Sequence, residues 1–414
     1  MADLNRRSLS ARARVASALG RLTARIVRRV RGSGGSVIGA RVTLALAPNV
    51  LGELAAGRRT AIVSGTNGKS TTTAMLAAAC TAGGRRVVSN IEGANLRTGI
   101  VATLSAAADA DLAVLEIDEL ALPQLLPSFA DPVVVLLNLS RDQLDRFGEV
   151  RTVAAGWRRA FSDRDDVTVI ANADDPLVVW GARAARHQVY VGVGLPWRLD
   201  AAACPACGGR IVVDHGSWHC DTCDLERPPC LELDDTALLD GDRIVVELTP
   251  GVPGRHNVAN AAQALLAAVE LGIDAAVAAA AITTVTSVAG RYRTVDVDGT
   301  AARLLLAKNP AGWAELLALI DGGSKPLLLA INARIADGAD PSWLWDVPYE
   351  QLVGRSVIAA GDRAADLAVR LHYADVPCEL WRGSLLDRLR AHDAPAVDVL
   401  ANYTAFADLV RDLG

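Results

Sequence analysis

The stretch S-G-T-N-G-K-S-T-T-T at residues 64–73 constrains the fold more than any other part of this 414-residue chain. An apolar run at residues 61–63 precedes it, and a helical pattern begins at Ser70. A strand, a glycine-rich turn and a helix in this order present backbone N–H groups and the helix dipole to an anion. We therefore predict a phosphate-binding turn within an α/β domain.

The turn departs from the usual nucleotide loop G-x-x-x-x-G-K-[ST], because Val63 occupies the position of the first glycine. The chemistry of the loop is nevertheless retained. Gly65 and Gly68 permit the tight turn, Lys69 supplies a charge for the terminal phosphates, and the hydroxyl of Ser70 is placed to bind magnesium. The alternative is a glycine turn with an accidental lysine, which the order of strand, turn and helix disfavours. The prediction is an ATP site with Mg²⁺.

Several apolar segments end in polar residues and alternate with helical patterns. They occupy residues 85–90, 111–118, 131–140 and 166–176. Apolar strands covered on both faces are typical of a parallel sheet. Polar residues at the carboxyl ends of such strands are where ligands bind in open α/β folds.

Three regions follow from the changes of pattern along the chain. Residues 1–40 read as a basic N-terminal helix and a Gly/Ser break, residues 41–290 as a central ATP-binding domain, and residues 291–414 as a second α/β domain. A cysteine-rich island at about 201–230 is inserted in the central domain.

The N-terminal region is strongly basic in a chain whose net charge is −5, since residues 1–31 hold nine arginines and one acid. The interpretation we favour is an ordinary first helix with a solvated arginine face. The alternative is an amphipathic helix resting on anionic lipid. No apolar run reaches the roughly 18–20 residues of a membrane span, and we expect no signal peptide. Apolar residues recur in this region at helical spacing: Val15, Leu19, Leu22, Ile26 and Val30.

Four of the seven cysteines form two C-x-x-C pairs, Cys204 with Cys207 and Cys220 with Cys223, separated by twelve residues. Four thiolates at this spacing suit a closed, tetrahedral, structural zinc site. A redox pair is the weaker alternative, because a single C-x-x-C would suffice for it.

Other potential ligands near the pairs are interpreted as bystanders. His215 and His219 lie between the pairs, and Cys230 lies beyond them. Zinc ribbons also bind nucleic acid, but the acidic remainder of the chain argues against that partner.

A group of acidic residues follows a buried segment of the second α/β domain. Asp337, Asp340 and Asp346 stand close together, with Trp343 and Trp345 among them. From spacing alone, packing and helix capping are the favoured roles of these residues.

Further segments resemble the Mur ligase superfamily, whose members join amines to carboxylates through acyl phosphates. The form G-T-N-G-K-[ST] occurs in that superfamily, and L-E-I-D-E places Glu116 at a strand end. The segment starting at Asn138 resembles N-x-x-x-D-H-L-D, with Asp142 and Asp145 matching, and residues 254–260 resemble G-x-H-N-x-x-N.

This resemblance implies a ligand for each of these positions. Ser70 and Glu116 would hold magnesium, the asparagines would contact adenine, and Arg291 would contact phosphate. The ATP-binding residues that it implies are Gly65, Thr66, Asn67, Gly68, Lys69, Ser70, Thr71, Asn138, Asn257, Asn260 and Arg291.

The chain departs from the peptide-forming Mur ligases, because Gln143 replaces the histidine of D-H-L-D and the C-terminal D-Y-A-H-x-P segment is absent. Instead, A-K-N-P-A-G-W at 307–313, A-D-G-x-D-x-S-W-x-W-D at 336–346 and the four cysteines resemble the MurT family, the Mur-ligase-like subunits of lipid II isoglutaminyl synthase. The fold that this resemblance implies is a P-loop ATPase domain with an inserted four-cysteine zinc ribbon, followed by a C-terminal Rossmann-like α/β domain.

The resemblance implies ATP-dependent amidation of the α-carboxylate of D-isoglutamate in the lipid II stem peptide, through an acyl phosphate, with Lys69 as the catalytic cation. Ammonia would come from a GatD-type glutaminase subunit in a heterodimer. In the family, an aspartate completes the glutaminase triad; we favour Asp346, then Asp340. Ala333 departs from an aspartate that the family often carries. The implied location is the cytoplasm, either free or at the inner face of the plasma membrane.

Two other functions compete with this interpretation. An independent ligase of the Mur or folylpolyglutamate type would need an amino-acid site, which the sequence does not show. A nucleotide-gated scaffold without catalysis is disfavoured by the intact Lys69, Ser70 and Glu116.

Overall fold

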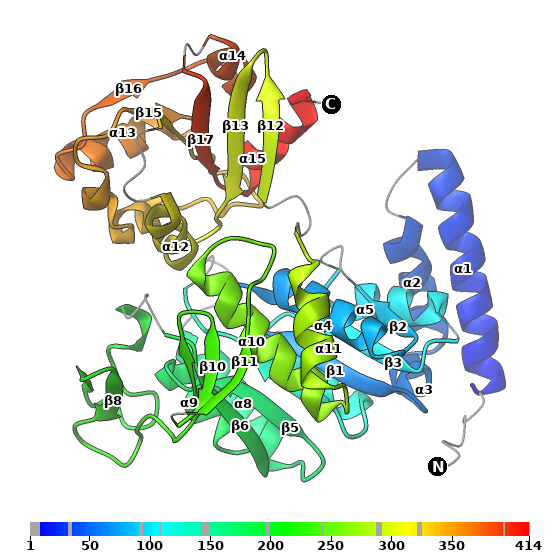
Figure 1. The fold of residues 1–414 in the computed structure, drawn as a ribbon. Helices are drawn as coiled ribbons and strands as arrows, with labels where there is room; N and C mark the ends of the chain where they lie inside the picture. Colours follow the sequence, from blue (N-terminus) through cyan, green and yellow to red (C-terminus); the bar gives the residue numbers. More distant parts are fainter. Residues whose placement is uncertain are drawn as a thin grey trace. The chain divides into compact units, whose positions relative to one another are not determined.

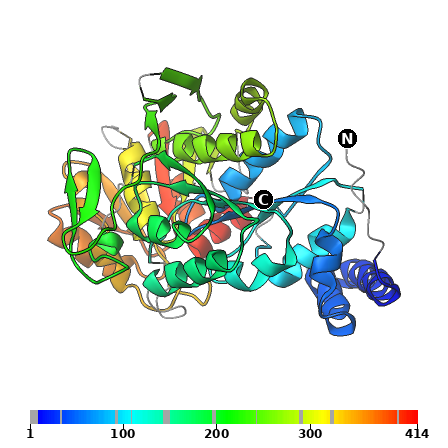
Figure 2. The same ribbon diagram turned by 90° about the horizontal axis from the view of Figure 1, so that it is seen from below.

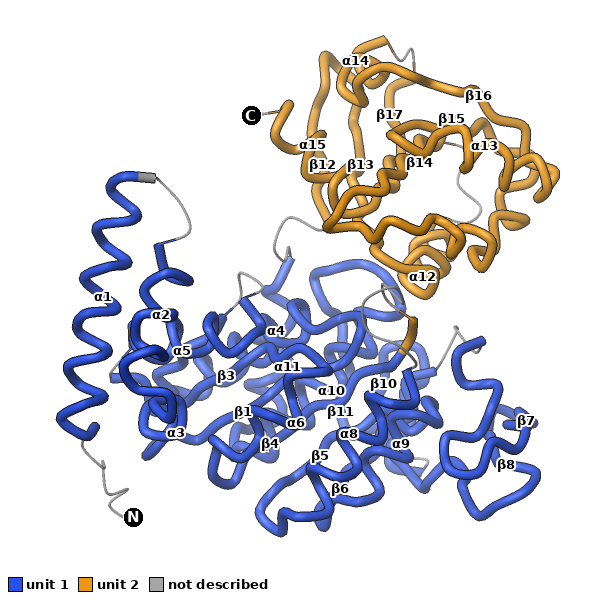
Figure 3. Tube along the Cα trace, turned by 180° about the vertical axis from the view of Figure 1, so that it is seen from behind, with its two compact units in different colours: residues 1–139, 150–195, 199–286 blue, residues 140–149, 196–198, 287–414 orange. Residues whose placement is uncertain are grey.

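The computed structural model describes residues 9–31, 35–90, 94–107, 109–141, 150–194, 199–241, 243–286, 292–320, 325–391 and 394–413. The chain divides into two compact units (Figure 3). Unit 1 comprises residues 1–139, 150–195 and 199–286, and unit 2 comprises residues 140–149, 196–198 and 287–414.

Unit 1 is built on a nine-stranded sheet with the order β11-β10-β9-β6-β5-β4-β1-β3-β2 (Figure 1). The pairs from β6 to β2 are parallel, as the apolar runs predict, and β9 also pairs in parallel with β6. The β9–β10 and β10–β11 pairs at this edge are antiparallel. Separately, β7 and β8 form a small hairpin. The strands are β1 (Arg59–Ser64), β2 (Val87–Ser89), β3 (Leu112–Glu116), β4 (Val133–Leu136), β5 (Thr168–Asn172), β6 (His187–Gly192), β7 (Ile211–Asp214), β8 (Ser217–Cys220), β9 (Leu231–Asp234), β10 (Ala237–Asp240) and β11 (Arg243–Glu247).

Helices cover both faces of this sheet and form two apolar cores (Figure 2). One core lies under α4, α10 and α11, and the other lies under α3, α5, α8 and α9. The helices are α1 (Ala11–Arg31), α2 (Gly35–Leu46), α3 (Val50–Ala55), α4 (Lys69–Ala82), α5 (Arg97–Ala106), α6 (Leu122–Leu125), α8 (Val150–Ser162), α9 (Pro176–Ala182), α10 (Arg255–Glu270) and α11 (Ala275–Thr283), with 3₁₀ turns η1 (Leu126–Ser128) and η2 (Leu199–Ala201).

Unit 2 has a six-stranded sheet with the order β12-β13-β17-β14-β15-β16, parallel except for the β12–β13 hairpin. Trp313 and Tyr349 are fully buried in its core. Trp343 packs against Trp313, so Trp343 has the packing role that its spacing suggested. The elements are β12 (Tyr292–Val297), β13 (Thr300–Leu306), α12 (Pro310–Ile320), β14 (Leu327–Ala330), η3 (Ser342–Asp346), η4 (Tyr349–Leu352), β15 (Val357–Ala360), α13 (Ala364–Tyr373), β16 (Cys378–Leu380), α14 (Leu385–Arg390), β17 (Ala396–Ala401) and α15 (Tyr403–Leu413).

The N-terminal helix α1 differs from the ordinary first helix that we favoured. Its small residues pack against α2, and its large apolar residues are exposed. None of the helices that the structure describes combines the length and the apolarity of a membrane span.

Candidate functional site

The predicted turn follows β1 in the middle of the sheet, and α4 begins at Lys69. Gly65 and Gly68 have φ angles of 139° and 88°, which side chains other than glycine rarely adopt. A Cβ atom at Gly65 would lie 2.9 Å from the carbonyl oxygen of Asn138, and one at Gly68 would lie 2.5 Å from Oδ1 of Asn260. Both positions therefore require glycine, for backbone angle and for space.

Asn138 is the main support of the turn. Its carbonyl oxygen accepts from the N–H of Thr66 at 2.8 Å. Its side-chain Oδ1 accepts from the N–H of Asn67, and its Nδ2 donates to the carbonyl of Asn67, both at 3.0 Å. The described geometry thus uses the Asn138 amide to position the turn.

The α10 asparagines lie on the other side of the turn. Both side chains belong to buried residues, and Asn260 Nδ2 donates to Asn257 Oδ1 at 3.2 Å. Asn257 Nδ2 in turn donates to the carbonyl of Pro253 at 2.7 Å. This network holds Asn260 against Gly68, so α10 fixes the N-terminus of α4.

The ammonium group of Lys69 is held by oxygen atoms of the turn and of a nearby carboxylate. Its ammonium group donates to the carbonyls of Gly65 and Thr66 and to Oε2 of Glu119, which lies 2.9 Å away in a largely buried ion pair. Sequence reasoning missed Glu119, although it follows β3 in the same L-E-I-D-E segment as Glu116.

Near Lys69 the carboxylates outnumber the one ammonium group, so the local net charge is negative. Burial lowers the pKa of Lys69, but the carboxylates of Glu119, Glu116 and Asp118 outweigh it and raise this pKa above its usual value. Burial, followed by the charge of Glu119, raises the pKa of Asp118. One ammonium group facing several carboxylates attracts further cations, a divalent metal ion in particular.

Ser70 and Glu116 meet at the start of α4. The Ser70 hydroxyl donates to Glu116 Oε2 at 2.7 Å, and Asn95 Nδ2 donates to Oε1 at 3.2 Å. Asn90 binds the backbone of Glu116 through two hydrogen bonds of 2.8 Å: its Nδ2 donates to the Glu116 carbonyl, and its Oδ1 accepts from the Glu116 N–H. A buried carboxylate and a hydroxyl are the hard oxygen ligands that magnesium prefers. Sequence reasoning missed Asn90 and Asn95.

Asp175 connects the neighbouring strand end to this network. Its carboxylate accepts from the N–H groups of Leu139, Leu177 and Val178, at 2.8, 2.9 and 3.3 Å. Burial raises its pKa to about 6 in spite of these three donors. Because Leu139 follows Asn138 directly, Asp175 fixes the segment that supports the turn.

The four cysteines of the two C-x-x-C pairs come together, with all sulfur atoms within 4.8 Å of one another. The Sγ atoms of Cys204 and Cys223 are 3.6 Å apart, and those of Cys207 and Cys220 are 3.5 Å apart. Four sulfurs bound to one ion at about 2.3 Å would stand about 3.8 Å apart. The side chain of His215 is 94% exposed. The cluster is therefore suited to a metal ion.

The hairpin of β7 and β8 packs on the part of unit 1 that carries the Asp175 loop. Trp218 donates from Nε1 to the carbonyl of Ala173 at 2.9 Å, and its ring packs against Val179 of α9. Arg227 pairs with Asp174 at 2.6 Å. Both contacts fall on the loop that carries Asp175, so the hairpin clamps this loop.

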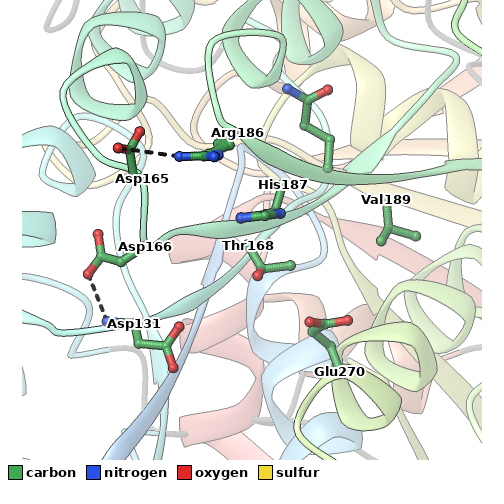
Figure 4. A pocket seen from close by; sticks show the side chains of 9 residues that line it. Asp131, Asp165, Asp166, Thr168, Arg186, His187, Val189 and Glu270 are labelled. Atoms are coloured by element: carbon green, nitrogen blue, oxygen red, sulfur yellow. Dashed lines mark hydrogen bonds and ion pairs between the residues drawn. The ribbon is translucent and has the colours of Figure 1, made fainter.

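A separate open pocket lies at the end of the strands opposite to the glycine turn (Figure 4). It opens at the amino ends of β5 and β6, whereas the glycine turn follows the carboxyl end of β1. Asp165 pairs there with Arg186, and Asp131 pairs with Arg59. The pocket is thus distinct from the turn. Its lining residues are Asp131, Asp165, Asp166, Thr168, Arg186, His187, Gln188, Val189 and Glu270.

The predicted aspartates of unit 2 differ in their surroundings. Asp337 is buried and accepts from the N–H and hydroxyl of Thr404 and from the N–H of Arg334. Asp340 is exposed, and the N–H and hydroxyl of Ser342 bind both of its oxygens and lower its pKa. Both oxygens of the Asp337 carboxylate are thus hydrogen-bonded within the unit, so this side chain has a structural role.

Asp346 stands at the end of η3 beside an exposed aromatic pair. Its side chain is 31% exposed and lies 3.2 Å from Arg141, which the contact pattern groups with the same unit. The adjacent Trp345 is 54% exposed and meets Tyr373 edge to face, with ring centroids 5.4 Å apart. The guanidinium of Arg370 lies over the Trp345 ring, 5.7 Å from its centroid. Tryptophan and tyrosine are residue types that are enriched in protein interfaces, and here both are exposed, whereas Arg370 is buried.

The predicted unit 1 residues thus gather around one turn: residues 65–71, Glu116, Asn138 and the α10 asparagines. Some predicted positions lie outside the residues that the structure describes: Asp142, Gln143, Asp145 and Arg291.

Comparisons with known proteins point to one family. The Mur ligase middle domain matches residues 63–195, and the MurT ligase C-terminal domain matches residues 306–406. The MurT subunit of lipid II isoglutaminyl synthase (glutamine-hydrolyzing) from Streptococcus pneumoniae is 29% identical, over 90% of this chain and 91% of that protein. Its counterpart from Staphylococcus aureus is 28% identical, over 85% and 86%.

Solved structures agree on the fold. A pseudomurein peptide ligase type C from Methanothermus fervidus aligns with a TM-score of 0.65 at 18% identity, over 86% of this chain and 79% of that one. Together with the metal-compatible cysteine cluster, this likeness confirms the predicted Mur-ligase-like fold.

Proposed function

The chain belongs to the MurT family of Mur ligases, and we propose that it activates a carboxylate with ATP and amidates it as the ligase subunit of a lipid II isoglutaminyl synthase. The buried constellation of Lys69, Ser70 and Glu116 carries this proposal, because it joins a phosphate-binding turn to a magnesium-type ligand pair. The substrate is the α-carboxylate of D-isoglutamate in the lipid II stem peptide, and the product is D-isoglutamine.

The mechanism follows from charge. A carboxylate is a poor electrophile, so its oxygen attacks the terminal phosphate of ATP, and ADP leaves. Ammonia then attacks the carbonyl of the acyl phosphate, and inorganic phosphate leaves to give the amide. Lys69 and the N–H groups of the turn offset the phosphate charge during the transfer. In the structure the Lys69 ammonium binds Glu119 and two carbonyls. Phosphate oxygens of a bound nucleotide would compete with these partners for the ammonium group.

Ser70 and Glu116 would hold the magnesium ion, which supplies positive charge next to the transferred phosphate. Asn95 and Asn90 keep the Glu116 carboxylate in place. Removing these contacts weakens metal binding without removing a ligand.

The nitrogen source in this proposal is a GatD-type glutaminase subunit, bound in a heterodimer. The exposed Trp345–Tyr373 pair, with Arg370 behind it, supplies an interface of the right character on unit 2. Asp346 lies next to this pair and is partly exposed, so it is our candidate for completing the glutaminase triad, with Asp340 second. The complex would act in the cytoplasm, at the inner face of the plasma membrane.

The metal ion of the cysteine cluster is zinc in this proposal, because four thiolates in tetrahedral reach are a structural zinc set. The N–H groups of Gly209 and Thr222 donate to the sulfurs of Cys207 and Cys220, at 3.3 and 3.4 Å, as suits charged thiolates. Zinc would act by holding the hairpin that clamps the Asp175 loop.

A Cys207→Ser/Cys223→Ser variant is expected to lose its zinc and to melt about 5 °C or more below the wild type, because the hairpin loses its staple. Metal content measured by mass spectrometry and a thermal melt check this. The matched control is Cys230→Ser/Cys378→Ser, which changes two cysteines outside the cluster. Full zinc in the first variant, or equal loss in the control, would contradict the assignment.

The function itself is tested by incubating lipid II with the chain, the candidate glutaminase, ATP, magnesium and glutamine. A mass loss of roughly one unit, from carboxylate to amide, is expected only when both subunits are present. ATP hydrolysis that is driven by an amino acid instead, with unchanged lipid II, would identify an independent ligase.

A further inference from the structure

Helix α1 carries a continuous stripe of exposed apolar side chains. At about 100° of rotation per residue, they share one sector of the helix, about 80° wide. Their exposed fractions are 60% for Val15, 43% for Leu19, 52% for Leu22, 55% for Ile26 and 77% for Val30. The helix lies side by side with α2 (Figure 1), yet this contact leaves the stripe uncovered.

The packing of α1 explains why the stripe faces outward. Its contact with α2 is made by small residues, with Ala13, Ala16 and Gly20 buried. A Cβ atom at Gly20 would lie 2.0 Å from Thr43 Oγ1, and one at Gly39 would lie 2.4 Å from the carbonyl oxygen of Gly20. Such close backbone approach requires glycine, so bulky side chains cannot occupy this face. A rotation of α1 that turned the apolar stripe toward α2 is therefore sterically excluded.

Arginines flank the stripe and are exposed as well. The helix contains seven arginines and no acid. Among the described residues, the six arginines from Arg12 to Arg29 form no ion pair with a carboxylate. Arg12 and Arg21 donate instead to the backbone carbonyls of Leu46 and Ser105. The six are Arg12, Arg14, Arg21, Arg25, Arg28 and Arg29.

We propose that α1 is a membrane-docking helix that lies in the surface of an anionic bilayer, with its apolar stripe in the acyl region and its arginines among the lipid phosphates. An apolar stripe beside a purely cationic sector is what an interfacial helix requires. Pairing with a second copy is disfavoured, because it would bring two sets of unneutralised arginines together. Nucleic acid would use the arginines but leave the stripe exposed.

The biological role of this docking rests on the proposed function, because a lipid-linked substrate is reached at a membrane surface. The docking itself needs neither ATP nor substrate, so it can be measured independently. Docking through α1 would confine the subunit to the plane that holds its substrate.

The test is co-sedimentation of the full-length chain with vesicles, without nucleotide or lipid II. Binding to vesicles with about one-third phosphatidylglycerol is expected to exceed binding to pure phosphatidylcholine by at least about tenfold. Leu22→Ser/Ile26→Ser and Arg25→Gln/Arg28→Gln/Arg29→Gln are each expected to reduce that binding by about tenfold or more, while melting like the wild type, because these side chains are exposed.

The matched control is Ile244→Ser/Val277→Ser, which removes two exposed apolar side chains on β11 and α11 and is expected to bind vesicles like the wild type. Equal binding to both kinds of vesicle, no binding to either, or retention by the Leu22→Ser/Ile26→Ser variant would overturn the proposal. So would a wild-type dimer in sedimentation that this variant dissociates, or preferential binding to a polynucleotide. In detergent, by contrast, the wild type and both α1 variants are expected to amidate lipid II at the same rate. If none of them amidates lipid II, the proposed function is wrong, and the docking proposal is unaffected.

Discussion

A Lys69→Ala variant is expected to lose ATP-dependent amidation by about a thousandfold or more. In the proposed mechanism Lys69 is the cation that offsets the charge of the transferred phosphate, and its ammonium group lies among the oxygens of Gly65, Thr66 and Glu119. Without it, magnesium and the turn amides alone would have to offset the developing charge. The loss is measured as the initial rate of phosphate release with lipid II and ammonium, so that the glutaminase plays no part.

Misfolding must be separated from lost chemistry, because Lys69→Ala leaves the largely buried Glu119 carboxylate without its partner. Breaking such a pair costs roughly 3–5 kcal/mol. A Lys69→Ala/Glu119→Gln variant removes both charges, and we expect it to regain stability and remain inactive. Lys325→Ala, on an exposed lysine of unit 2, is the control with full activity. Recovery of turnover in the double variant would refute the catalytic role of Lys69.

The parallel half of the main sheet was predictable, because its strands are uninterrupted apolar runs buried on both faces. The antiparallel pairing of β10 with β9 and β11 was not, because these strands are short and partly exposed and a strand pattern does not identify its partner. Which face of α1 packs against the unit could not be predicted, for a physical reason. Apolar periodicity identifies a helix face, but the close approach at Gly20 and Gly39 decided which face packs.

The candidate site shows the same division. Lys69, Ser70 and Glu116 were predictable, because their positions follow from a turn and a strand end along the chain. Glu119 and Asn95 were not, since irregular segments bring them to the site only in three dimensions. The sequence also left Asp337, Asp340 and Asp346 unresolved. Burial and hydrogen bonding now set Asp337 apart, because its carboxylate is satisfied by Thr404 and Arg334.

An Asp346→Asn variant is expected to lose glutamine-driven amidation by about 10³-fold or more and to keep ammonium-driven amidation at the wild-type level. If Asp346 completes a triad with the glutaminase cysteine and histidine, an amide in its place cannot stabilise the protonated histidine. The proposed site around Lys69, Ser70 and Glu116 lies in unit 1, and the hydrogen bonds described for it do not involve Asp346. Both rates are measured with the same complex, and only the nitrogen source changes.

The neighbouring residues separate catalysis from docking. Trp345→Ala removes a 54% exposed aromatic side chain and is expected to weaken the complex with the glutaminase, whereas Asp346→Asn is expected to leave its affinity unchanged. Asp340→Asn is the matched carboxylate control, since its oxygens are already bound by Ser342. If Asp340→Asn shows the selective loss of glutamine-driven activity, the triad role moves to Asp340. If Asp346→Asn loses both activities equally, the residue supports the fold or the ligase reaction, and the triad assignment is wrong.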